Sequence, residues 1–220
     1  MKIISVNVSL PIEVEHRRKV VETGIFKKSV PGSVRVDRLN LVGDRQADLV
    51  NHGGEDKAVY AYSLDHYAYW QDLLNRDSMP YGQFGENLTV AGLDESKSYI
   101  GDHLQIGSTL MAITQPRVPC FKLGIRMENK EMPKLFSKSA RTGFYLKVLT
   151  EGTVEAEDTI EIVQRGNGAI SVKRLFEALF HPRTHNAVDV LDQALDVPEL
   201  SQEWRKQIED RLKRRGDIEN

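Results

Sequence analysis

The chain has 220 residues, of which 40% are hydrophobic and 28% are charged, a composition typical of a folded globular protein with one or two domains. Its formal net charge of −2 gives no support for binding nucleic acid or an anionic membrane through overall charge, so any cationic site has to be local. The single cysteine excludes an intrachain disulfide.

The first fifty residues alternate between apolar and polar side chains, a pattern that predicts β-strands. In MKIISVNVSLPIEVE, the polar residues Ser5, Asn7 and Ser9 interrupt the apolar positions. This segment therefore predicts a strand rather than a signal peptide, and no twenty-residue apolar span follows it. We expect a cytoplasmic protein that does not bind membranes.

The middle of the chain mixes helical and strand patterns. The segment SLDHYAYWQDLL, residues 63–74, has helical spacing, with Ser63 as the expected N-cap. Residues 86–90 predict a strand, and residues 103–115 predict a hairpin around a Gly-Ser turn. Helical stretches are expected from residue 120 to about residue 138.

The last part of the chain changes character after the run RGNG. Two strands joined by an acidic loop are expected between residues 143 and 165, and three helices are expected beyond them. The final helix has a Ser201 cap, a Gly216 stop and six Arg and Lys residues, but acidic residues interleave with these. A solvated or dimer-facing surface is therefore favoured over nucleic-acid binding. We predict a strand-rich domain over residues 1–165 and a three-helix domain over residues 166–220.

The only cysteine, Cys120, lies in QPRVPCFKL between two cationic residues. A lone cysteine is often a small buried apolar residue. Here Arg117 and Lys122 favour the thiolate electrostatically, and the two neighbouring prolines stiffen the backbone. A thiolate on a rigid turn is a good nucleophile or a ligand for a soft metal.

Two further segments concentrate polar residues and glycines. GDRQADLVNHGGEDKAVYAY, residues 43–62, is dense in polar side chains, and FGENLTV, residues 84–90, places an asparagine next to a glycine. Exposed loops often have such a composition, so each segment alone is weak evidence for a site. The chain contains no HExxH motif, no CxxC pair and no Gly-x-Ser-x-Gly elbow, which argues against the metal sites and hydrolases with those signatures.

Taken together and in this order, the runs GDRQAD, HGGEDKAVYAY, FGENLT, YIGD and QPRVPCFKL resemble the MOSC domain family (molybdenum cofactor sulfurase C-terminal), and especially its bacterial YiiM-like members. The resemblance covers nearly the whole chain, because YiiM-like proteins also carry a short three-helix domain. It implies a mainly β fold, with a β-barrel-like MOSC domain and flanking helices, followed by a small all-α domain.

The resemblance also implies a basic pocket for the molybdenum cofactor, in which Cys120 is the metal ligand and the catalytic residue. Such a pterin with a phosphate tail is anionic and heterocyclic, so its pocket requires cations and polar groups at the ring edges. We assign the charge to Arg45, Lys57, Arg117 and Lys122, and contacts to the pterin to His52 and Asn87. Pyridoxal phosphate has been suggested for the wider family, but no lysine stands out as a Schiff-base former.

The expected activity is an oxidoreductase reaction that detoxifies N-hydroxylated compounds such as hydroxylaminopurine. It converts R–NHOH, two electrons and two protons into R–NH₂ and water, with electrons from a partner reductase protein. One alternative is a non-catalytic module that carries the molybdenum cofactor or a persulfide on Cys120. Another is a structural or regulatory protein with a buried, unreactive Cys120. The helical tail makes a homodimer the expected assembly.

Overall fold

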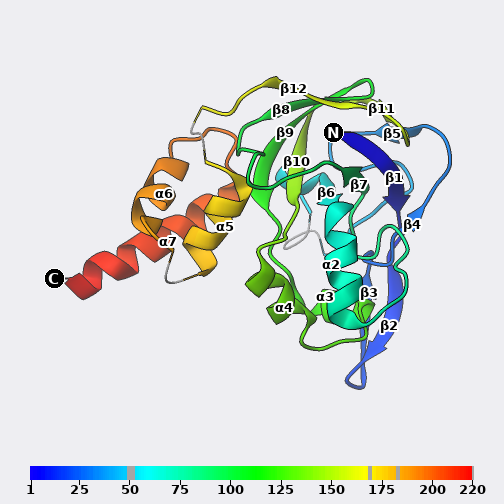
Figure 1. The fold of residues 1–220 in the computed structure, drawn as a ribbon, viewed down its shortest axis with the longest axis horizontal. Helices are drawn as coiled ribbons and strands as arrows, with labels where there is room; N and C mark the ends of the chain where they lie inside the picture. The colour runs from blue at the N-terminus through cyan, green and yellow to red at the C-terminus, as the bar shows by residue number, and fades with distance from the viewer. Residues whose placement is uncertain (49–52, 168–169, 182–183, 220) are drawn as a thin grey trace.

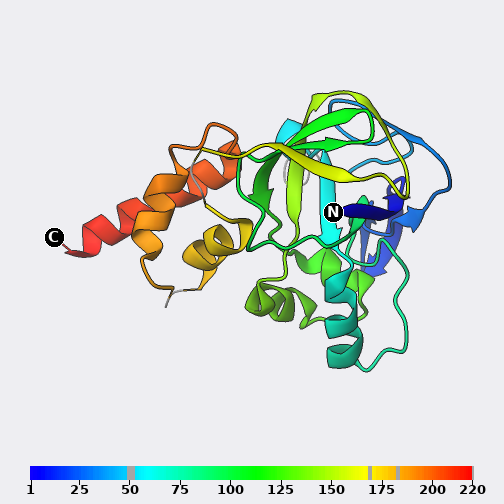
Figure 2. The ribbon, with the colours of Figure 1, turned by 45° about the horizontal axis from the view of Figure 1, so that its top comes forward.

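The computed structural model describes residues 1–48, 53–167, 170–181 and 184–219, with residues 215–219 described only by their backbone. A strand-rich part comes first, and three helices gather at one end of the molecule (Figure 1). The helices labelled α2, α3 and α4 in Figure 1 lie at the opposite end of the sheet from its last strand in the chain, β12 (Figures 1 and 2). The helices are α2 (Asp65–Leu74), α3 (Phe121–Arg126), α4 (Met132–Ser139), α5 (Val172–Phe180), α6 (Ala187–Ala194), α7 (Gln202–Glu219) and the short 3-10 helix η1 (Glu55–Lys57).

Eight strands form one mixed sheet in the order β12-β8-β9-β10-β6-β7-β1-β4. Neighbouring strands run antiparallel except for β6 and β7, which are parallel. Two small ribbons, β2 with β3 and β5 with β11, pair separately. The strands are β1 (Lys2–Val8), β2 (Ile12–His16), β3 (Lys19–Thr23), β4 (Lys28–Ser29), β5 (Val34–Val36), β6 (Val59–Ser63), β7 (Leu88–Ala91), β8 (His103–Ile106), β9 (Thr109–Pro116), β10 (Phe144–Thr150), β11 (Gly152–Val154) and β12 (Ile160–Gln164).

The expected β-barrel-like domain is a mixed sheet rather than a closed barrel. Over the described ranges, β12 and β4 are the two ends of the strand order. The first strand meets the chain before β12 through backbone bonds such as Ile3 N to Asp158 O, at 2.9 Å, an isolated bridge and the ion pair of Lys2 with Glu157, but the two strands form no continuous ladder. The ribbons of β2 with β3 and of β5 with β11 pair outside the sheet and do not complete a ring. The expected strand-rich core and the three C-terminal helices are both present.

Two apolar clusters hold the elements around the site. The larger one fills the sheet interior and continues into the C-terminal helices, where Val172, Leu175 and Phe176 lie on the buried face of α5. The second is largely aromatic and includes Trp70 and Phe136, whose rings stack against each other between the sheet and helices α2 and α4. Burying each such side chain contributes about 1.5–3 kcal/mol, which is what keeps these helices against the sheet.

Several sequence-based expectations are confirmed and others are corrected by the backbone. The hairpin around Gly107 is formed by β8 and β9, and the hydroxyl of Ser201 accepts a hydrogen bond from Trp204 N at 3.2 Å, as a cap does. Ser63 is not a cap, because it ends β6 and its hydroxyl donates to Leu93 O. Gly216 does not stop α7, which runs to Glu219. None of the helices in the described ranges is both long and apolar enough to span a membrane.

Candidate functional site

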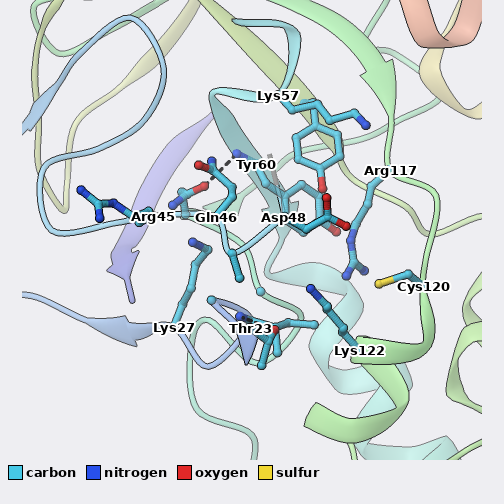
Figure 3. A pocket seen from close by; sticks show the side chains of 16 residues that line it. Thr23, Lys27, Arg45, Gln46, Asp48, Lys57, Tyr60, Arg117, Cys120 and Lys122 are labelled. Atoms are coloured by element: carbon cyan, nitrogen blue, oxygen red, sulfur yellow. Dashed lines mark hydrogen bonds between the residues drawn. The ribbon is translucent and has the colours of Figure 1, made fainter. Parts of the chain in front are cut away.

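A pocket that opens to solvent collects most of the candidate residues, and the empty space in and above it amounts to about 590 Å³. Its walls come from the chain between β3 and β4, the loop after β5, η1, the start of β6, the turn before β7, the exit of β9, α3 and β10. Segments far apart in the sequence therefore meet at one site (Figure 3). The lining residues are Thr23, Gly24, Ile25, Lys27, Arg45, Gln46, Ala47, Asp48, Lys57, Tyr60, Gly85, Asn87, Arg117, Cys120, Lys122 and Tyr145.

Cys120 lies in the wall of this pocket at the N-cap position of α3. Its side chain is partly exposed, so it is not the fully buried apolar residue that one alternative required. Arg117 and Lys122 lie beside its sulfur atom in Figure 3, one on the β9 exit and one on α3. Two adjacent cations stabilise a thiolate over a thiol, which makes this sulfur a suitable ligand for a soft metal.

Arg117 is a fixed cation at the base of the site. Its side chain is buried, and its guanidinium lies 5.1 Å from the ring centroids of both Tyr60 and Phe136. Burial opposes its charge, but the neighbouring Tyr60, Tyr145 and Cys120 leave the pKa of Arg117 above its ordinary value. Within the described residues its Nη1 atom has no hydrogen-bond partner. A buried charged donor without an acceptor indicates a place for an anionic ligand.

The other predicted cations differ in their surroundings. Lys57 is buried in η1 and forms an ion pair with Glu203 of α7. Lys122 is partly exposed on α3, and Arg45 is exposed at the edge of the pocket. The predicted cationic set is therefore brought together, with Lys57 already engaged by the three-helix part of the chain. Of the two residues predicted to contact the pterin, His52 lies outside the described residues.

Asn87 lines the pocket, but its amide is used by the protein itself. Its Oδ1 accepts from Tyr60 N at 3.0 Å, and its Nδ2 donates to Asp44 Oδ2 at 2.9 Å and to Asn7 O at 3.3 Å. Both ends of the side chain are thus occupied. This favours a role in fixing the pocket wall over the direct contact with a pterin that the sequence suggested.

Sequence reasoning missed a further cation of the pocket, Lys27, and the carboxylate of Asp44 that pairs with it. Lys27 lines the pocket and pairs with the fully buried carboxylate of Asp44. Burial lowers the pKa of Lys27, and the charge of Asp44 opposes this effect. Asp44 also accepts from Ser9 N at 2.8 Å, so one carboxylate joins three segments of the wall. The pair Lys27-Lys28 gave no signal for this role, because doubled lysines usually face solvent.

Tyr145 also lines the pocket and was not predicted, because in the sequence it looks like an ordinary residue of a strand, here β10. Its ring lies 5.1 Å from that of Tyr60. Burial raises the pKa of Tyr145, and the nearby Arg117 lowers it to a smaller extent. The phenol therefore remains protonated at neutral pH and can donate a hydrogen bond. In the described part of the chain, no group of three or more His, Cys, Asp or Glu side chains is arranged to hold a metal ion.

Two family models match the chain. The model described as "MOSC domain" matches residues 48–161, and the model described as "YiiM-like, 3-alpha helix domain" matches residues 170–215. The first spans most of the sheet, and the second spans α5 to α7 up to residue 215. Together they include Cys120 and every described cationic pocket residue except Lys27 and Arg45.

Individual proteins agree with the family models. YflK of Bacillus subtilis (strain 168), described as uncharacterized, is 39% identical over 92% of this chain and 90% of its own length. The crystal structure of YiiM from Geobacillus stearothermophilus superposes with a TM-score of 0.80 at 32% identity, over 96% of this chain and 98% of that one. A Gibberella moniliformis (strain M3125 / FGSC 7600) protein named "Reductase" is 31% identical over 66% of this chain, which corresponds to 26% of that longer protein.

Proposed function

Because the chain belongs to the MOSC domain family and carries the YiiM-like three-helix domain, we propose that it is a molybdenum-cofactor-dependent reductase of N-hydroxylated compounds. The MOSC family is associated with binding of the molybdenum cofactor, and one relative bears the name "Reductase". The observation that carries the proposal is the partly exposed Cys120 in a cation-lined pocket, beside a buried arginine whose Nη1 has no acceptor among the described residues.

The residues present fit an anionic cofactor that bears a soft metal. The Cys120 thiolate would bind the metal, and Arg117 and Lys122 would bind the negative charges of the cofactor. The Nη1 of Arg117, which has no partner within the ranges that the structure describes, is the specific feature that supports this fit, since a ligand oxygen would accept its hydrogen bond. Lys27, with its own buried partner, would act mainly by shaping the opposite wall.

The proposed reaction converts R–NHOH, two electrons and two protons into R–NH₂ and water, and it uses electrons from a separate reductase protein. When bound, the cofactor supplies the two-electron redox chemistry. The neighbouring charges of Arg117 and Lys122 would favour the thiolate form of Cys120 as the metal ligand. Tyr145, which burial keeps protonated, offers a hydroxyl donor to the N-hydroxyl oxygen of a substrate.

A reduction assay with hydroxylaminopurine tests the proposal. Protein from a host that synthesises the cofactor, supplied with a chemical reductant such as reduced methyl viologen, is expected to form the amine. Cys120→Ser should lower the rate by at least about a hundredfold, because a hydroxyl is a poor ligand for a soft metal. Full activity in this variant, with its fold verified by circular dichroism, would refute the proposal.

The second candidate is a carrier of the cofactor or of a persulfide, which the partly exposed thiol also favours. Mass spectrometry of the native protein separates the two functions. One additional sulfur atom on Cys120, without turnover, supports the carrier. Bound pterin together with amine formation supports the reductase.

A further inference from the structure

The pocket has a contact with the three-helix part of the chain that the proposed function does not use. Lys57 lines the pocket from η1, and its ammonium forms an ion pair with the carboxylate of Glu203 in the first turn of α7. The Lys57 side chain is 9% exposed and that of Glu203 is 43% exposed. The lysine is thus enclosed, while its partner is partly open to solvent.

The start of α7 is fixed in this position by bonds other than the ion pair. Ser201 N donates to Thr114 O on β9, and Gln202 N donates to Asp56 Oδ2 on η1, each at 3.3 Å. Thr114 Oγ1 in turn donates to Asp56 O at 2.6 Å. These backbone contacts hold the helix start against the two elements that form the pocket edge, so the position of Glu203 does not depend on Lys57.

The ion pair changes the charge distribution around the pocket. In Figure 3, Lys57 lies apart from the group formed by Arg117, Cys120 and Lys122, and runs along the edge of the site. Glu203 neutralises its charge there, while the inner cations keep theirs. The effect of Glu203 reaches the cavity, because its charge adds to burial in raising the pKa of Tyr145.

From this geometry we propose that Glu203 is a positioning residue of the pocket: it holds the Lys57 ammonium at the pocket edge and cancels its charge. The three-helix domain thereby sets which substrates enter. The inner cations face the anionic cofactor. At this part of the pocket edge the charges of Lys57 and Glu203 cancel, so a substrate that carries a carboxylate is attracted less strongly than an unpaired lysine would attract it, whereas an uncharged N-hydroxylated substrate is unaffected. This statement about substrates rests on the proposed function, whereas the statement about Lys57 does not.

Chemical labelling of the cofactor-free protein tests the position of Lys57 directly. Trace acetylation with acetic anhydride, followed by mass spectrometry, gives the rate at Lys57 relative to the exposed Lys134 of α4. Glu203→Gln is expected to raise this relative rate about five-fold, which is the effect of losing one Coulomb partner near the surface. Glu203→Asp keeps the charge and should restore most of the protection.

The matched control is Glu209→Gln, which removes the same charge from an exposed position of the same helix. It should leave the labelling rate of Lys57 unchanged. An unchanged rate in Glu203→Gln, or an equal rise in both variants, would overturn the proposal. Because the assay needs neither cofactor nor turnover, its result is independent of the proposed reductase activity.

Steady-state kinetics of the loaded enzyme test the consequence for substrates. For 4-(hydroxyamino)benzoate, which carries a carboxylate, KM should fall about five-fold in Glu203→Gln at low ionic strength, with kcat unchanged. For neutral N-phenylhydroxylamine, KM should stay the same, and Glu209→Gln should alter neither value. Equal changes for both substrates would refute the selectivity claim. Absence of activity in the unmodified protein would refute the proposed function instead, and would leave the labelling result in force.

Discussion

At the scale of single residues, the buried guanidinium of Arg117 carries a desolvation cost in folding and offers a cation to the pocket. Its guanidinium is buried between two aromatic rings and has one donor atom without an acceptor among the described residues. A buried charge of this kind contributes little to the stability of the empty protein, because desolvation offsets its attractive contacts. Under the proposed function, this arginine binds the anionic cofactor.

Arg117→Met should therefore separate binding from stability. We expect at least a tenfold loss of bound molybdenum, corresponding to about 1.4 kcal/mol or more. The free energy of unfolding of the cofactor-free protein should fall by less than about 1 kcal/mol, since the lost ring contacts are offset by the lost desolvation cost. Metal analysis and urea denaturation measure the two quantities.

Arg141→Met is the control for that variant, because Arg141 lies 3.9 Å from the ring centroid of Tyr69, away from the pocket lining. It should leave the molybdenum content unchanged. A large loss of stability in Arg117→Met with normal metal content would show that the arginine is structural.

The buried carboxyl group of Glu86 should make the free energy of unfolding depend on pH. Its buried carboxylate accepts from Tyr67 Oη and, at 2.9–3.0 Å, from Gly82 N, Phe84 N and Thr89 Oγ1. Burial raises the pKa of Glu86 despite these donors. The native state therefore holds this proton more tightly than the unfolded chain, and the free energy of unfolding should decrease as the pH rises from about 4.3 through the native pKa.

Glu86→Gln removes this titration, so its urea-unfolding free energy should show a smaller decrease over the same pH range. The exposed Glu131→Gln should keep the pH dependence of the unmodified protein. If all three proteins have the same slope, burial of Glu86 is not linked to stability.

At the scale of elements, the loop after β5 is attached to its neighbours by one carboxylate. Asp44 accepts from Ser9 N after β1, from Asn87 Nδ2 before β7, and from Lys27 before β4. Asp44→Asn should destabilise the protein by about 3 kcal/mol, because it leaves Lys27 buried without its anion. Thermal denaturation of this variant and of Lys27→Met/Asp44→Asn measures the effect. The double variant should recover much of the loss, and equal stability of both would contradict the assignment.

The regular elements follow from local sequence, and the exceptions have identifiable causes. The hairpin at Gly107 and the apolar face of α5 depend on turn chemistry and periodicity, so they were predictable. Ser63 resembled a cap but belongs to β6, where it pairs with Val90 of β7. Gly216 ends no helix, since glycine inside a helix is tolerated at a cost of about 1 kcal/mol.

At the scale of the whole molecule, the two parts of the chain share one apolar cluster. It extends from the sheet interior to Leu175 of α5 and Trp204 of α7. The bonds of Ser201 and Glu203 to the pocket edge join the same parts. We therefore expect a single unfolding transition by calorimetry, with equal calorimetric and van't Hoff enthalpies. Two resolved transitions would mean that the parts are thermodynamically separate.

The pocket could be predicted only in part. Arg117, Cys120 and Lys122 stand together in the sequence, so their charge pattern was visible. Lys27 and Tyr145 join them only through strand order, which no local pattern encodes. Glu203 lies further away still, and its contact with Lys57 depends on how α7 packs against the sheet.

The most direct test of the central claim is the molybdenum and pterin content of protein purified from a cofactor-synthesising host. The unmodified protein is expected to contain close to one equivalent of each, and Cys120→Ser is expected to lose most of the metal. An unmodified protein without metal and pterin, or a Cys120→Ser variant with the full amount of both, would contradict the account.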